Sequence, residues 1–155
     1  KNNGLKYTIL CGIIEMNKKP VFINPKQLSS LCFHECTHPF VNQHLTSDYD
    51  LLAKTEKLFI DVDENSIAKQ NYFTYNEYLE DLVVRTVVAY MHFKYGYSTL
   101  EEYHKELDYM EEIGFIYIKD IASILETKDF YKSMDLIRKY LYTVTNSKKV
   151  NHKNK

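Results

Sequence analysis

The sequence is poor in the residues that build several common kinds of site. Its 155 residues include only four glycines, and they form no phosphate-binding loop. The three cysteines, Cys11, Cys32 and Cys36, are odd in number and make no close CxxC pair, which argues against a disulfide framework. We expect Cys32 and Cys36 to be small core residues. As metal ligands they are disfavoured, because on a helix they lie about 100° away from His34 and His38 respectively.

The sequence also lacks a strong net charge and a long apolar run. Lys and Arg number 20 against 21 Asp and Glu, so the formal net charge is -1 and no global field points to nucleic acid or to an anionic membrane. No apolar run approaches the roughly 20 residues needed to cross a bilayer, and no signal-peptide pattern opens the chain. We expect a soluble protein with no membrane span and no nucleic-acid partner.

The chain does contain enough apolar residues for one sizeable core. It is 45% hydrophobic and 14% aromatic, which at this length suits a single domain. Residues 147–155, SKKVNHKNK, have no apolar periodicity. The sequence therefore predicts one domain over residues 1–146, followed by a disordered basic tail over residues 147–155.

Strand signals come first along the chain. Residues 6–15 are rich in β-branched and aromatic types, and residues 20–23 form a second such run after a polar turn, so we expect a β-hairpin. Asn24 as N-cap and Pro25 at the first helical position then predict a helix. Pro39 should end or kink this helix, because proline has no N–H to donate to the carbonyl four residues earlier.

Helix signals dominate the rest of the chain. A capping box at residues 74–77 and an apolar run over residues 79–95 predict a buried central helix. A second capping box at residues 98–101 begins the next helix, which Gly114 closes. Further helices are expected over residues 47–59, with Ser47 as N-cap, and over residues 118–125 and 130–144. The predicted fold class is α+β and predominantly α, with a small N-terminal hairpin followed by helices.

The most informative motif is HECTH at residues 34–38. Histidines four apart project from one face of a helix, so His34 and His38 can bind one Zn²⁺, with Glu35 beside a metal-bound water. Such an arrangement is the core of a zinc hydrolase. The alternative is a pair of surface histidines on an amphipathic helix, because short motifs also occur by chance.

A third zinc ligand is expected from the helix over residues 79–95. On a helical wheel Glu80 falls in the middle of the apolar face, with Glu77 about 60° away. An ionised carboxylate there would lose several kcal/mol of solvation unless a cation met it. We therefore choose Glu80 as the third ligand. The alternatives are an ion pair with a cation such as Arg85, or a helix end that is more exposed than the wheel suggests.

Two stretches of the sequence, HECTHPFVN at residues 34–42 and EYLEDLVVRTVVAYMHFKYG at residues 77–96, resemble the bacterial DUF4932 family. The resemblance implies a zincin-like fold of the gluzincin type, with HExxH on one helix and a glutamate from a later helix as third zinc ligand. The family pattern places an acid one turn before the arginine, which here is Asp81. The spacing common in gluzincins favours Glu77 instead, with Asp81 behind it, so three nearby acids are candidates.

The expected reaction is the hydrolysis of peptide bonds in a peptide or protein substrate. With His34, His38 and Glu80 holding one Zn²⁺, a water would take the fourth position, the open coordination that distinguishes a catalytic zinc site. Glu35 would act as general base, taking a proton from that water and passing it to the leaving amine.

Further roles are expected around this centre. Arg85 is a second catalytic candidate, which either orients Asp81 one turn away or stabilises the developing oxyanion. The resemblance implies that residues 20–23 form the edge strand that pairs with an extended peptide. Asn42 either holds the chain where the motif helix ends or is a plain turn residue. Candidate transition-state donors are Tyr90, His92 and Tyr95.

Two other classes of function compete with the peptidase. One is a catalytically degenerate zincin-like domain that binds metal or a protein partner without turnover, although the presence of Glu35 favours the enzyme. The other is a helical interaction domain in which the HECTH match is accidental. The substrate, the oligomeric state and the compartment stay open. The start at Lys1 suits a mature or trimmed chain, and removal of a signal peptide would make the protein secreted or periplasmic in a bacterium.

Overall fold

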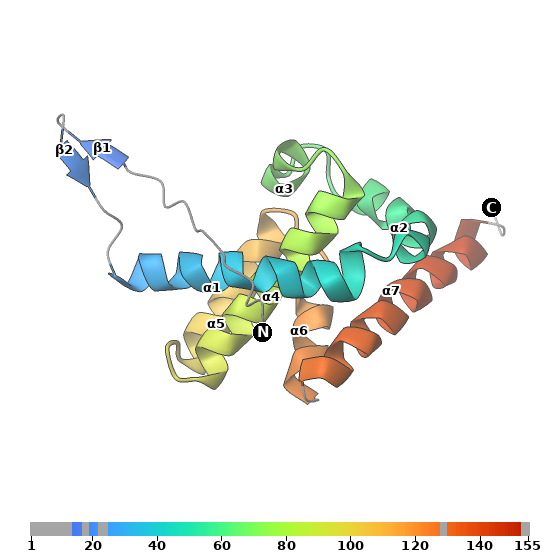
Figure 1. Cartoon of the computed structure of the whole chain (residues 1–155). Coiled ribbons are helices and arrows are strands. Elements are labelled where there is room, and N and C mark those ends of the chain that lie inside the picture. Colours follow the sequence, from blue (N-terminus) through green and yellow to red (C-terminus); the bar gives the residue numbers. More distant parts are fainter. Residues whose placement is uncertain (1–13, 17–18, 22–24, 128–129, 153–155) are drawn as a thin grey trace, which may run out of the picture.

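The computed structural model describes residues 14–16, 19–21, 25–127 and 130–152. Helices make up almost all of this part of the chain (Figure 1). The helical elements in chain order are α1 (Pro25–Val41), the π-helix η1 (Asn42–Thr46), α2 (Tyr49–Thr55), the 3-10 helix η2 (Glu56–Asp61), α3 (Ile67–Asn71), α4 (Tyr75–Lys94), α5 (Leu100–Glu112), α6 (Ile118–Thr127) and α7 (Phe130–His152).

The predicted α+β fold class is wrong. The strands in the described ranges are β1 (Ile14–Met16) and β2 (Lys19–Val21), an antiparallel pair of three residues each that lies away from the helices (Figure 1). Two such short strands cannot form a layer against which helices pack, so the described fold is helical throughout its core. Most of the predicted strand at residues 6–15 lies outside the described residues.

The edge strand expected beside the motif helix is not found either. Residues 19–21 pair with β1 and stand apart from the helices, and residues 22–24 lie outside the described residues. Among the described residues, therefore, no strand runs beside α1 to receive an extended peptide, and the zincin-like architecture is not what these residues form.

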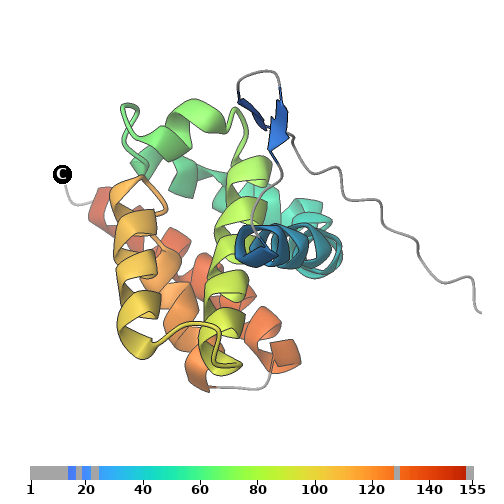
Figure 2. The same ribbon diagram turned by 90° about the vertical axis from the view of Figure 1, so that its left-hand side faces the viewer.

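Helix α4 is the centre of the core. It packs against α1 on one side and against α5 and α6 on the other (Figure 2). Its apolar run is buried almost all round, with Tyr78, Leu82, Val83 and Val84 fully inaccessible. The helix begins at the predicted capping box, in which the Thr74 side chain accepts from a backbone N–H and a glutamate side chain accepts from Thr74. Local sequence thus begins α4, and burial on every side stabilises it.

Helix α1 begins at Pro25 as predicted but does not end at Pro39. It continues to Val41 and passes into η1, where the Ser47 N–H donates to the Asn42 carbonyl at 2.9 Å. Val41 is fully buried, so the packing of this turn compensates for the hydrogen bond that Pro39 cannot donate.

Smaller differences from the sequence predictions have local causes. Asp48 rather than Ser47 caps α2, accepting from the Leu51 N–H at 3.0 Å, because a carboxylate is at least as good a cap as a hydroxyl. The second capping box is formed by Thr99 and Glu102, one residue later than predicted. Cys32 is only partly buried and Cys36 is exposed, so neither is the small core residue that we expected.

Two helical segments were not predicted. The short helix α3 lies between residues 59 and 74. Its five residues are too few to show the apolar periodicity by which a helix is predicted. Helix α7 continues to His152, through most of the tail predicted to be disordered, whereas residues 153–155 lie outside the described residues. A helix already nucleated by its packed first half extends at little cost, even through a polar sequence.

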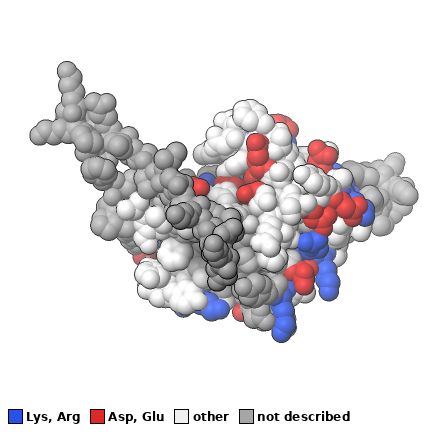
Figure 3. Space-filling model, viewed as in Figure 1, with Lys and Arg blue, Asp and Glu red and all other residues white. Residues whose placement is uncertain are grey.

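The surface gives two further observations. On the face shown in Figure 3, acidic and basic side chains of the described residues are interspersed rather than gathered by sign. Among the described helices, none is long and apolar enough to cross a membrane. The expectation that the chain has no nucleic-acid partner stays a prediction.

Gly114 generates a test of this packing. Its φ is 115°, and a Cβ there would lie 2.5 Å from the Ser66 Oγ at the start of α3. We expect Gly114→Ala to lower the free energy of unfolding by about 2–4 kcal/mol, from backbone strain plus overpacking. The control, Gly96→Ala, has φ 75° and no atom within 4 Å of the added Cβ, and should cost only about 1–2 kcal/mol. Urea unfolding measures both, and equal losses would contradict the close approach of α3.

Candidate metal centre

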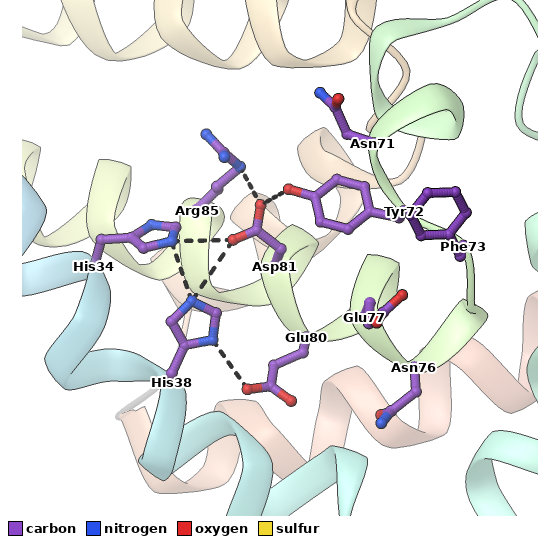
Figure 4. Close-up of a pocket in the computed structure, with 10 residues that line it drawn as sticks. All are labelled: His34, His38, Asn71, Tyr72, Phe73, Asn76, Glu77, Glu80, Asp81 and Arg85. Atoms are coloured by element: carbon purple, nitrogen blue, oxygen red, sulfur yellow. Dashed lines mark hydrogen bonds and ion pairs between the residues drawn. The ribbon is translucent and has the colours of Figure 1, made fainter. Parts of the chain in front are cut away.

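The two histidines of the HECTH motif lie together on α1 and face α4 (Figure 4). Because they are one turn apart, their rings come close, and the two Nε2 atoms are 3.1 Å apart. Both rings line a pocket of about 590 Å³ and are partly buried. The structure therefore places His34 and His38 as the motif predicts, with one nitrogen of each ring turned to the same point.

The acid that joins them is Asp81 of α4. Its Oδ1 atom lies 3.1 Å from the Nε2 atom of His34 and 3.8 Å from that of His38, and the side chain is only 7% exposed. Ligands of a tetrahedral zinc ion at 2.0–2.2 Å lie about 3.3–3.5 Å from one another. The three distances scatter around that value, so these three atoms could hold one metal ion once the proton between His34 and Asp81 has left.

Glu80, the third ligand expected from the sequence, does not lie against the two Nε2 atoms. Its Oε1 atom contacts the Nδ1 atom of His38 at 2.9 Å, on the opposite side of the ring from Nε2. A carboxylate in this contact cannot bind the ion that Nε2 faces. Glu80 and Asp81 are adjacent on α4 and about 100° apart, so both can reach α1. The apolar face of the wheel favoured Glu80, whereas the family pattern pointed to Asp81.

Asp81 is also held from behind. Its Oδ2 atom accepts hydrogen bonds from the Tyr72 hydroxyl and from Nε of Arg85, the latter at 2.5 Å. Burial raises the pKa of Asp81, but the hydrogen bonds from His34 and Tyr72 and the charge of Arg85 outweigh it and hold this pKa well below its usual range. Asp81 is therefore a carboxylate with one oxygen anchored and the other turned to the histidines.

The two side chains that contact Oδ2 of Asp81 are those of Arg85 and Tyr72. Of the two roles open to Arg85, its contact with Asp81 matches the orienting one. Burial and the neighbouring carboxylate raise the pKa of Tyr72 to about 12, so its hydroxyl stays protonated and donates. Tyr72 could not be predicted from the sequence, because it is one of fourteen tyrosines and lies in a connector without periodicity.

The remaining candidates lie apart from the three ligand atoms. Glu77 closes the capping box of α4, its Oε2 atom accepting from the Thr74 N–H at 3.1 Å. Glu35 is exposed and is not among the residues that line the pocket. The pocket is lined, besides the motif histidines, by Asn71, Tyr72, Phe73, Asn76, Glu77, Glu80, Asp81 and Arg85. The three donors proposed from sequence, Tyr90, His92 and Tyr95, are not among them.

The ligand assignment makes a prediction. Asp81→Asn should weaken zinc binding by more than 100-fold, because loss of a direct ligand should exceed the roughly 10- to 100-fold lost with an outer partner. Glu77→Gln, which removes a charge from the same pocket but keeps a side chain that can close the capping box, should leave zinc affinity within about twofold. Competition with a chromophoric chelator measures both, and the reverse ranking would make Glu77 the ligand.

Comparisons with known proteins identify the family and nothing more specific. A search of curated proteins and a search of solved structures each found no match. A family model described as a domain of unknown function, DUF4932, matches residues 1–140. Because this match covers most of the 155 residues, the chain belongs to the DUF4932 family.

Proposed function

We propose that this protein is a zinc-dependent hydrolase of peptide bonds. The observation that carries the proposal is the convergence of three atoms that can bind a metal, Nε2 of His34, Nε2 of His38 and Oδ1 of Asp81, which lie 3.1–3.8 Å from one another beside a pocket. Two imidazoles and one carboxylate are a common donor set for catalytic zinc, which keeps its fourth position for water or substrate. When bound, zinc supplies a Lewis acid that polarises a carbonyl and acidifies water.

The residues around the donor set suit this role. His34, His38 and Asp81 would hold the ion, and the anchoring of Asp81 by Arg85 and Tyr72 keeps its free oxygen in place without a metal. A site that is already arranged loses less entropy on binding than one that must be ordered. One carboxylate and two neutral imidazoles would also leave a positive charge at the centre, which favours an electrophilic rather than a purely structural site.

The general base in this proposal is Glu35. It lies beside His34 on α1, and its role would be to take a proton from the attacking water and pass it to the leaving amine. As an exposed side chain it is free to change rotamer, and catalytic contacts often tighten only when substrate binds. The structure does not show this contact, so the assignment of Glu35 rests on the motif.

The pocket supports a peptide-sized substrate. Its volume of about 590 Å³ falls within the range of roughly 300–1,000 Å³ that is typical of pockets for drug-sized ligands. The wall opposite the histidines presents the amides of Asn71 and Asn76, which can both donate and accept, and the ring of Phe73, which is 89% exposed. Amides suit a peptide backbone, and an exposed ring suits an apolar side chain.

A second candidate function is a metal-binding domain without turnover. It is favoured by one observation, that the carboxylate of Glu35 does not line the pocket beside the ligand atoms. In this case the HECTH motif would hold a structural or regulatory ion, and the protein would act by binding a partner. The two candidates share the metal and differ only in whether Glu35 does chemistry.

One experiment separates them. We expect the purified protein to carry about one equivalent of zinc and to hydrolyse members of a mixed peptide library, with activity lost in a chelator and restored by zinc. Glu35→Gln should keep the zinc and lower kcat by at least 100-fold, because it removes the base and not a ligand. Glu112→Gln, an exposed glutamate on α5 beyond the opposite side of α4, should keep full activity.

The outcomes are distinct. Bound zinc with no hydrolysis of any library member would favour the metal-binding domain. Activity that survives Glu35→Gln would reject Glu35 as the base. No zinc in the protein, with none taken up on titration, would reject both functions and leave the HECTH match accidental.

A further inference from the structure

Glu80 makes a contact with His38 that the proposed hydrolase leaves without a role. Its Oε1 atom lies 2.9 Å from the Nδ1 atom of the ring, and its side chain is only 20% exposed (Figure 4). A mostly buried carboxylate loses much of its hydration, and this loss is costly unless hydrogen bonds from the protein replace the lost contacts with water. The contact to Nδ1 supplies one of them.

The other oxygen of Glu80 is held by η1. The Thr46 hydroxyl lies 3.0 Å and the Asn42 amide nitrogen 3.3 Å from Oε2, and these two side chains are 3.1 Å from each other. Thr46 is buried. Thus both oxygens of Glu80 accept hydrogen bonds. Oε1 contacts the ring of His38 on α1, and Oε2 contacts two side chains of η1, the π-helix that follows α1. Asn42 begins η1 rather than a turn, and its side chain contacts Thr46 and Glu80.

This arrangement restricts the proton on His38. A neutral imidazole has one N–H, and an ionised carboxylate can only accept. The contact with Glu80 therefore places the proton of the neutral ring on Nδ1 and leaves a lone pair on Nε2, the atom that faces His34 and Asp81. A metal ion needs that lone pair.

We propose that Glu80 is a positioning residue, which holds His38 in the tautomer and ring orientation that binds the metal. The inference rests on the proposed function, because it assigns a purpose to the contact only if His38 is a ligand. Carboxylates that accept from the far nitrogen of a ligating histidine orient the ring and raise its basicity. The network of Asn42 and Thr46 then serves to keep Glu80 itself in place.

The test compares three variants with the unsubstituted protein. Glu80→Ala removes the acceptor, Glu80→Gln keeps an acceptor oxygen without the charge, and Glu77→Gln removes a charge from the same helix and pocket without touching His38. Two quantities are measured for each: zinc affinity by chelator competition, and the ¹⁵N chemical shifts of the His38 ring in the metal-free protein, which report the tautomer. Far-UV circular dichroism establishes that each variant is folded.

We expect the unsubstituted protein to show His38 with its proton on Nδ1 at a pH where the ring is neutral. Glu80→Ala should lose this fixed tautomer and bind zinc about 10- to 100-fold more weakly. Glu80→Gln has one acceptor oxygen for the two positions at which Glu80 accepts, so it should keep only part of the fixed tautomer and lose less affinity than Glu80→Ala. A purely structural role would leave the tautomer unchanged in both variants. Glu77→Gln should match the unsubstituted protein in both quantities.

Three results would overturn the inference: a proton on Nε2 in the unsubstituted protein, zinc affinity of Glu80→Ala within twofold of normal, or equal losses in Glu80→Ala and Glu77→Gln. Failure of the proposed function looks different. If the unsubstituted protein bound no zinc at all, the hydrolase and the role of Glu80 in metal binding would both be rejected, whereas normal zinc binding with an unchanged Glu80→Ala variant would reject the inference alone.

Discussion

The buried carboxylate of Asp81 is the interaction on which the site depends. It contacts His34 on the distant helix α1, Tyr72 in the connector before α4, and Arg85 one turn further along α4. Removing a carboxylate from water costs several kcal/mol, and only its full set of donors offsets that cost. The contacts that offset the cost of burying Asp81 also leave its Oδ1 atom turned to the histidines. The same contacts therefore stabilise the packing of α1 against α4 and set the geometry of the site.

Two carboxylates that are adjacent on α4 therefore have different tasks. Asp81 faces the Nε2 atoms of both histidines, and Glu80 faces the Nδ1 atom of His38. Neighbouring residues on a helix point about 100° apart, so the two successive acids of α4 reach opposite nitrogens of the His38 ring. The pair explains why a helix that is otherwise apolar carries two acids at this point, each of which would be costly without its partners.

Local signals predicted the parts of the site that lie within one helix. The spacing of His34 and His38 places both rings on one face, and the capping box at Thr74 and Glu77 begins α4 where the sequence predicts it. The pairing of helices was harder to predict. The choice of Glu80 over Asp81 depended on how α4 is rotated against α1, and a difference of a few tens of degrees in that rotation exchanges the two acids. Tyr72 was missed because its role comes entirely from a neighbour nine residues away.

The sequence by itself determined the motif on α1, the apolar character of α4 and the starts of the main helices, because these follow from contacts between residues a few positions apart. Only the tertiary structure decided that α1 runs on past Pro39, that the core contains no sheet in the described residues, and that Asp81 rather than Glu80 lies against the Nε2 atoms of both histidines. Each of these depends on the free energy of packing between distant segments. In the case of Pro39 that packing outweighs a local preference of about 3 kcal/mol, which no pattern within a single helix can reveal.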